Sequence, residues 1–260
     1  PESARRLARA LVALGQTEAA AALADGPRAT HDDATQRYIR GLLASDAGKL
    51  KVAHDLLAAA ADQLTGDAFA QMAYADLLMK QDQATKASTY YRRAMTADKE
   101  PIAALGAAHA ALQKGDWQEA EAAGREAEAR AARSLTHARV RAEAMAVQAQ
   151  ALIASGNRRN LGRADRLLQK SLRVEPDLPE ALLGLGQLAE RKRRTDEAIR
   201  RYKRLTQVAP KDPEAAFRLG RLLFADRKAR ELGRTELQRA STLDAEGAWG
   251  ERARRLLTGR

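Results

Sequence analysis

A period of 34 residues constrains this chain more than any other feature of its sequence. Residues 176–186 read Pro-Asp-Leu-Pro-Glu-Ala-Leu-Leu-Gly-Leu-Gly, and residues 210–220 read Pro-Lys-Asp-Pro-Glu-Ala-Ala-Phe-Arg-Leu-Gly. Proline, glutamate, alanine, leucine and glycine return at the same places. One period further back, Ala198 maps onto Ala164. A fixed period of this length indicates structural repeats that stack on one another.

Small and bulky residues recur at set places within the period. Glycine on the first helix of an expected helix pair lets the second helix approach, at a cost of roughly 1 kcal/mol each in helix propensity. These glycines are Gly41, Gly186 and Gly220. The alanines expected where paired helices touch are Ala53, Ala87, Ala120, Ala164 and Ala198. The bulky residues expected to fill the space toward the next unit are Leu57, Tyr91, Leu168 and Tyr202.

This pattern resembles the tetratricopeptide repeat, a helix–turn–helix unit whose copies stack into a solenoid. The turn from Gly115 to Ala120, Gly-Asp-Trp-Gln-Glu-Ala, is close to the Gly-Asp-Tyr-x-Glu-Ala turn of that family. The resemblance covers essentially the whole chain and is strongest over 34–120 and 164–224. It implies an all-α fold, a right-handed α-solenoid of about seven helix–turn–helix units plus a C-terminal capping helix.

The resemblance also implies that residues 1–260 form a single array. Its units are expected near 1–33, 34–67, 68–100, 101–141, 142–178, 179–212 and 213–246, with the capping helix at 247–260.

The composition agrees with an all-α protein. Apolar residues make up 45% of the chain but aromatic residues only 4%, and alanine, leucine, arginine, glutamate and glutamine all favour helix. No apolar run approaches the ~18–20 residues that cross a bilayer. Cysteine is absent, which excludes disulfides and thiolate metal sites. The chain begins Pro1-Glu2-Ser3, as a fragment or a processed form would, so periplasm and cytoplasm both stay open.

Positive charge is concentrated in the second half of the chain. The net charge is +11, of which residues 1–130 contribute about −2 and residues 131–260 about +13. A basic patch is expected from Arg191, Lys192, Arg193, Arg194, Arg200, Arg201, Lys203 and Arg204. Such a patch indicates an acidic partner surface or nucleic acid. A solvated, arginine-rich exterior is the commoner explanation of a charge run, and the residues leave both open.

The sequence contains no arrangement of residues that indicates catalysis. The four histidines, His31, His54, His109 and His137, fall in different expected units and lack the spacing of metal ligands. The Gly184-Leu-Gly186 stretch lacks the preceding strand and the third glycine of a phosphate-binding turn. We therefore expect no enzyme, no metal and no cofactor.

The resemblance places candidate binding residues on the first helix of each pair, which lines a concave groove in tetratricopeptide repeat proteins. The candidate groove residues are Tyr38, Phe69, Met72, Asp76, Leu105, His109, Gln150, Gln187, Phe217, Arg218 and Arg221. Tyr38, Phe69 and Met72 are expected to form one exposed patch. This groove would be apolar toward the N-terminus and cationic toward the C-terminus, and the alternative is that several of these residues are core.

The leading hypothesis is a non-catalytic scaffold that binds a helix or an extended segment of another protein in this groove. Assembly of a bacterial surface or secretion machine is the expected setting, since the alanine- and arginine-rich composition resembles bacterial arrays of this kind.

The alternative is binding of an acidic surface or nucleic acid by the basic half, although single strands would require aromatic platforms beside the charges. The family's clamp for chaperone C-termini uses asparagines, and the chain's two, Asn157 and Asn160, lie in an inserted turn. That binding mode is disfavoured.

Overall fold

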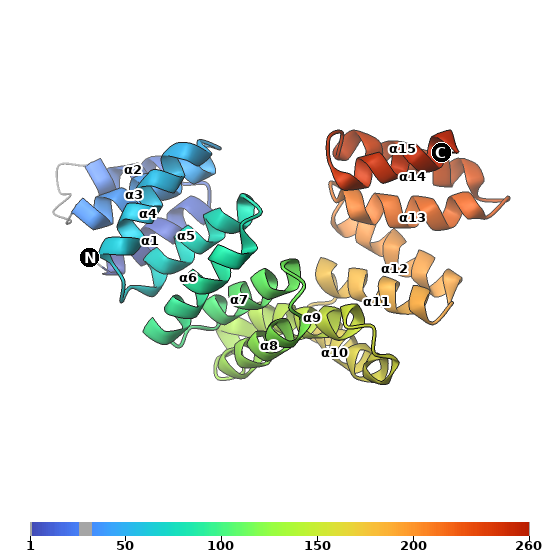
Figure 1. The fold of residues 1–260 in the computed structure, drawn as a ribbon, viewed down its shortest axis with the longest axis horizontal. Helices are drawn as coiled ribbons and strands as arrows, with labels where there is room; N and C mark the ends of the chain where they lie inside the picture. Colours follow the sequence, from blue (N-terminus) through green and yellow to red (C-terminus); the bar gives the residue numbers. More distant parts are fainter. Residues whose placement is uncertain (1, 26–32, 260) are drawn as a thin grey trace. The chain divides into compact units, whose positions relative to one another are not determined.

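A computed structural model describes residues 2–25 and 33–259 of the chain. These residues form fifteen α-helices, two short 3₁₀ helices and no strand (Figure 1). The helices follow one another as seven antiparallel pairs and a last single helix, so the predicted fold class is confirmed. None of the described helices is both long and apolar enough to cross a membrane.

The chain divides into two compact units, Pro1–Val140 and Arg141–Arg260. The helices of the first unit are α1 (Glu2–Ala13), α2 (Thr17–Asp25), α3 (Asp33–Asp46), α4 (Leu50–Gln63), α5 (Ala68–Lys80), α6 (Ala84–Ala97), α7 (Pro101–Gln113) and α8 (Trp117–Ala131), followed by the 3₁₀ helix η1 (Leu135–His137). Helix α9 (Ala138–Ala154) crosses into the second unit. The rest are η2 (Arg158–Asn160), α10 (Leu161–Val174), α11 (Pro179–Arg191), α12 (Thr195–Val208), α13 (Pro213–Ala225), α14 (Arg230–Leu243) and α15 (Ala248–Thr258).

The turns inside the pairs share one backbone conformation. In most of them three residues link the helices, and the middle one has a positive φ, which glycine adopts without a steric penalty. Glycine occupies this place at Gly15, Gly48 and Gly115, whereas Asp82 and Arg193 occupy it between α5 and α6 and between α11 and α12. The fifth pair also turns at a glycine and then adds the single 3₁₀ turn η2, which accounts for the extra residues seen there in the sequence.

Close contacts between glycine and a bulky side chain set the spacing of the helices. A Cβ built on Gly41 would lie 2.7 Å from Cγ of Leu57, within one pair, and a Cβ on Gly186 would overlap the ring of Tyr202. Gly220 makes the equivalent approach to the backbone and side chain of Leu237. The predicted role of these three glycines is confirmed.

Other bulky residues reach the next pair. Leu168 of α10 fills the space beside Gly184 of α11, and Tyr91 of α6 fills the space beside Gly106 of α7. The expectation that the bulky set faces the next unit therefore holds for Leu168 and Tyr91, while Leu57 and Tyr202 pack mainly on their own first helix. The contacts of Tyr91 and Leu168 join the third pair to the fourth within the first unit and the fifth pair to the sixth within the second unit.

We expect Gly186→Leu to destabilise the protein by ~1–3 kcal/mol or more, because the new side chain must displace Tyr202 from a close-packed contact. Gly162→Ala is the matched control, since no atom lies within 4 Å of a Cβ built there. Urea unfolding followed by circular dichroism measures both changes. Equal stability of the two variants would show that the glycine contact does not set the helix spacing.

Candidate functional site

A hollow of about 350 Å³ opens on the first unit between α1, α5 and α7. Its lining is mostly apolar. Helix α5 contributes Phe69 and Met72, α7 contributes Ile102, and α1 contributes Ala10 and Ala13. The remaining lining residues are Arg6, Arg9 and Glu100. We call this hollow the apolar groove.

Met72 forms the buried part of the apolar groove and Ile102 its open part. Met72 is 1% exposed, Phe69 is half-buried and Ile102 is 42% exposed. Phe69 and Ile102 both stand on the first turn of their helices, α5 and α7, which are the first helices of consecutive pairs. The stacking of the pairs therefore brings them to one surface.

Helix α1 is fixed beside this groove by a buried ion pair. The guanidinium of Arg5 donates through Nε to Oδ2 of Asp67 at 2.9 Å and through Nη1 to Oγ1 of Thr35 at 2.6 Å. Both charged side chains are less than a tenth exposed. Asp67 also accepts a hydrogen bond from the backbone N–H of Ala70 and so caps α5. One arginine thereby ties α1 to both α3 and α5.

Two more arginines of α1 contact α5. Arg9 donates to Oδ2 of Asp76 at 3.0 Å, and Asp76 also accepts the hydroxyl of Tyr91 at 2.5 Å. The guanidinium of Arg6 lies 5.0 Å from the centre of the Phe69 ring, a cation–π distance. Arg6 and Arg9 at the edge of the apolar groove are therefore in contact with α5, and the floor of the groove stays apolar.

The predicted exposure of Tyr38 and Met72 is wrong. Tyr38 is 0% exposed, and burial raises the pKa of its phenol, against the opposite effect of the nearby Arg9 and Arg5 of α1. Helix α1 covers the face of α3 on which Tyr38 stands. Tyr38→Asp would place a carboxylate in this core, so it is expected to unfold the protein rather than to abolish binding selectively.

Three other candidates of the first unit lie outside the apolar groove. Leu105 is buried in α7 and His109 of the same helix is half-buried. Asp76, which belongs to the contacts that hold α1, has a side chain that is 44% exposed. Of the residues predicted on this unit, the structure brings only Phe69 and Met72 to the groove. Arg6, Arg9, Ala10, Ala13, Glu100 and Ile102 were not predicted.

The predicted groove residues of the second unit form a polar network. Arg218 donates to Oε1 of Glu214 at 2.7 Å, and Arg221 pairs with Glu190. Oε1 of Glu190 also accepts the hydroxyl of Tyr202 at 2.6 Å, and burial together with this bond raises the pKa of Tyr202. The predicted groove was expected to be cationic toward the C-terminus. This expectation is wrong here, because Glu214 pairs with Arg218 and Glu190 pairs with Arg221.

The remaining predicted residues of the second unit are also engaged. Gln187 donates to Oε1 of Glu214 at 3.4 Å, and Gln150 donates to the carbonyl of Glu180 at 3.0 Å. Phe217 is 8% exposed and its ring lies 5.4 Å from that of Trp249. Glu190, the twelfth residue of the sixth expected unit, was not among the predicted groove residues.

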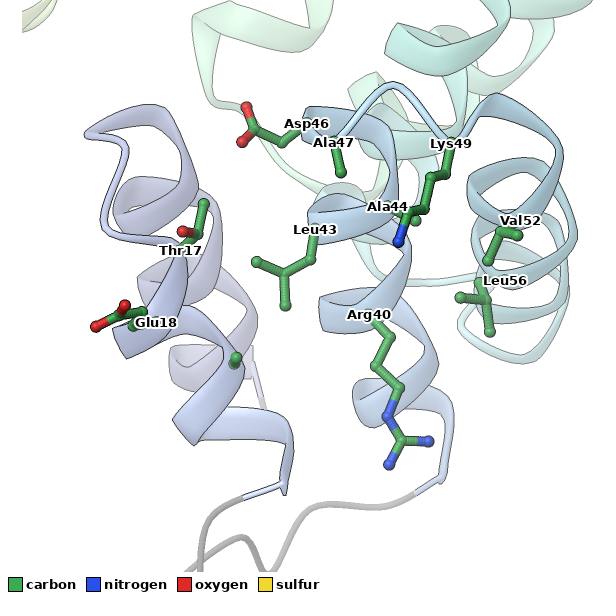
Figure 2. Close-up of a pocket in the computed structure, with 11 residues that line it drawn as sticks. Thr17, Glu18, Arg40, Leu43, Ala44, Asp46, Ala47, Lys49, Val52 and Leu56 are labelled. Carbon is green, nitrogen blue, oxygen red and sulfur yellow. The ribbon is translucent and has the colours of Figure 1, made fainter.

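A second hollow of the first unit lies between α2, α3 and α4 and has a volume of about 690 Å³ (Figure 2). Figure 2 shows Leu43 of α3 and Val52 and Leu56 of α4 beside it. Thr17, Glu18, Arg40, Asp46 and Lys49 surround these apolar residues, and Arg40 pairs with Asp25. This hollow is larger but more polar than the apolar groove, and no predicted groove residue lines it.

The predicted basic patch combines cations of two kinds. Lys192 pairs with Asp165 at 2.6 Å, Arg204 with Asp177 at 2.7 Å and Arg194 with Glu197 at 3.5 Å. Within the described part of the chain, the members that pair with no carboxylate are Arg191, Arg193, Arg200, Arg201 and Lys203. The cations that pair with carboxylates stabilise the fold locally. The cations without a carboxylate partner remain available to contact a partner.

The histidines do not gather into a site among the described residues. His54 shares a hydrogen bond with the Tyr74 hydroxyl at 3.0 Å, and His137 lies 3.4 Å from Glu100. His31 falls outside the described residues. No group of three or more histidine, aspartate or glutamate side chains there could hold a metal ion.

Comparison with protein families identifies the architecture. Tetratricopeptide repeat profiles match residues 72–135, 146–199 and 179–222, which together cover more than half of the chain. The chain belongs to the tetratricopeptide repeat family. No curated protein matches the sequence.

Solved tetratricopeptide repeat structures share this fold at low sequence identity. A tetratricopeptide repeat protein from Parabacteroides merdae ATCC 43184 has a TM-score of 0.71 at 16% identity, over 99% of this chain and 97% of that one. A chain of the APC/C hetero-tetramer Cut9–Hcn1 has a TM-score of 0.73 at 12% identity, over 95% of this chain and 47% of that one. PilW, described as a widely conserved type IV pilus biogenesis factor, has a TM-score of 0.67 at 13% identity, over 85% and 98%.

These likenesses establish the fold, and the tetratricopeptide repeat fold is that of a protein–protein interaction scaffold. Since stacked repeats expose one long surface made of first helices, the apolar groove lies where such scaffolds can meet a partner.

The Arg5–Asp67 ion pair gives a test of how α1 is held. Arg5→Met is expected to destabilise the protein by ~3 kcal/mol, because it leaves the buried Asp67 carboxylate without its charge partner. The neighbouring side chain of Arg6 is 58% exposed, so Arg6→Met should stay within ~0.5 kcal/mol of the wild type. Urea unfolding of both variants measures the difference, and equal effects would contradict this view of α1.

Proposed function

We propose that this protein is a non-catalytic scaffold that binds an apolar segment of a partner protein in the apolar groove. The observation that carries the proposal is an open, mostly apolar lining in which Ile102 is 42% exposed beside the half-buried Phe69. Exposed apolar side chains that gather at one hollow are characteristic of binding surfaces, whereas scattered ones are normal on any protein. Ile102 and Phe69 gather in this way.

The chemistry of the groove indicates what the partner contributes. A leucine, methionine or aromatic side chain would lose water against Met72, Phe69 and Ile102, and this burial supplies the binding free energy. Arg6, Arg9 and Glu100 at the edge offer polar contacts to the backbone of the incoming segment. An amphipathic helix or an extended segment satisfies both requirements.

We further propose that the partner belongs to an assembly on a bacterial surface or in a secretion machine. The resemblance of the composition to bacterial arrays supports this setting. PilW, the pilus biogenesis factor with the same fold, gives a precedent for the architecture in such a process at 13% identity. The partner itself is to be identified by experiment.

A selection experiment tests the groove directly. A phage-displayed library of random 16-residue peptides is selected on the full chain, and the affinities of the enriched peptides are measured by isothermal titration calorimetry. Ile102→Asp is expected to weaken binding by roughly 30-fold, because an anchor contact carries ~2 kcal/mol. The exposure of Ile102 should leave the melting temperature near that of the wild type.

Val52→Asp is the matched control, because Val52 is 51% exposed and lines the hollow between α2, α3 and α4. It should leave the affinity within twofold of the wild type. If Val52→Asp abolishes binding and Ile102→Asp does not, the binding site is the hollow of Figure 2. If neither variant changes the affinity, the proposal fails.

A further inference from the structure

Six exposed cations lie on or beside α10 and α12, the second helices of the fifth and sixth pairs. Figure 1 labels both helices. We call these six cations the basic face. Its members are Arg166, Lys170 and Arg173 on α10, Arg193 in the turn before α12, and Arg200 and Lys203 on α12. Three of them, on α10, did not belong to the basic patch that the sequence predicted.

The cations of α10 form one stripe. Arg166, Lys170 and Arg173 are spaced by four and three residues, and residues with this spacing stand on the same side of an α-helix. With a rise of 1.5 Å per residue, the stripe extends over roughly 10 Å. Like charges one helical turn apart destabilise a helix slightly, and no carboxylate among the described residues pairs with the stripe to offset this cost.

The repeat places the cations of α12 on the same side of the second unit. Arg166 and Arg200 are 34 residues apart, on the second helices of consecutive pairs, and so occupy one repeat position. Lys170 and Arg204 are related in the same way, although Arg204 pairs with Asp177 and is not part of the basic face. Equivalent positions of stacked repeats share a face, so the two helices present their charges together.

Neighbouring cations show which charges the fold itself uses. Lys192 and Arg204 lie in the same region, and each pairs with a carboxylate, Asp165 and Asp177. None of the six cations of the basic face pairs with a carboxylate among the described residues. Residues 1–140 are neutral in sum, so residues 141–260 carry the whole net charge of +11. A positive field of this kind attracts and orients an acidic partner.

We propose that the basic face is a second docking surface, which binds an acidic segment of a partner protein with carboxylates spaced by three or four residues. A helix with such spacing matches the stripe on α10, and every contact is then an arginine or lysine facing a carboxylate. Single-stranded nucleic acid is less well matched, since its bases stack on exposed aromatic rings. The one aromatic residue of α10 and α12, Tyr202, is 0% exposed.

The test uses the full chain and a labelled 20-residue helical peptide with glutamate at every third or fourth position. Fluorescence anisotropy measures its binding at 50 and 150 mM salt. The first variant combines Arg166→Glu, Lys170→Glu and Arg200→Glu. We expect it to weaken peptide binding at least tenfold, and circular dichroism should show unchanged helix content, because the three side chains are exposed.

A second variant carries the same change in net charge elsewhere. Lys51→Glu, Lys86→Glu and Lys99→Glu alter exposed cations of the first unit and should leave peptide binding within threefold of the wild type. An equal loss in both variants would mean that only net charge matters, and the proposal would be overturned. Failure of the wild type to bind the peptide would overturn it too. So would tighter binding of a 20-nucleotide RNA, single-stranded or duplex, which would make the basic face a nucleic-acid surface.

Discussion

Bulky side chains packed against glycine are the contacts on which the rest of this structure depends. Tyr202 lies where a Cβ on Gly186 would be, and Tyr91 and Leu57 stand in the same relation to Gly106 and Gly41. Because close-packed cores tolerate little added volume, the contacts at Gly186 and Gly41 fix how near the helices of a pair approach, and the contact at Gly106 fixes how near the next pair approaches. The same spacing, repeated along the chain, brings the first turns of α5 and α7 to one surface and so creates the apolar groove.

Tyrosines of the second helices also reach carboxylates on the first helices, with different consequences in the two units. In the first unit Tyr91 donates to Asp76, which in turn holds Arg9 of α1. In the second unit Tyr202 donates to Glu190, which pairs with Arg221. The first unit uses its carboxylates to fix α1 and keeps an apolar opening. In the second unit carboxylates pair with Arg218 and Arg221, and among the described residues cations without a carboxylate partner remain on α10, α11 and α12 and in the turn before α12.

The period of 34 residues was enough to predict the seven helix pairs, the last helix and the glycine contacts, since each follows from local spacing. It also placed Phe69 and Met72 at the groove. It failed at Tyr38, because the burial of that residue depends on Arg5 reaching Asp67, a contact between residues 62 positions apart. A repeat pattern describes what consecutive units share, and the placement of α1 across α3 and α5 belongs to one unit alone. Arg6 of α1 was missed for the same reason. Ile102 was missed although it occupies the repeat position of Phe69, the second residue of the first helix of its pair.

A partner segment that binds the first unit between α1, α5 and α7 should protect these helices. Hydrogen–deuterium exchange of the full chain, with and without a peptide selected on it, measures this protection. Bound peptide is expected to slow exchange of amides in residues 2–13, 68–80 and 101–113 and to leave α2, α4 and α12 unchanged. Slower exchange confined to α2 and α4, or to the second unit, would contradict this expectation.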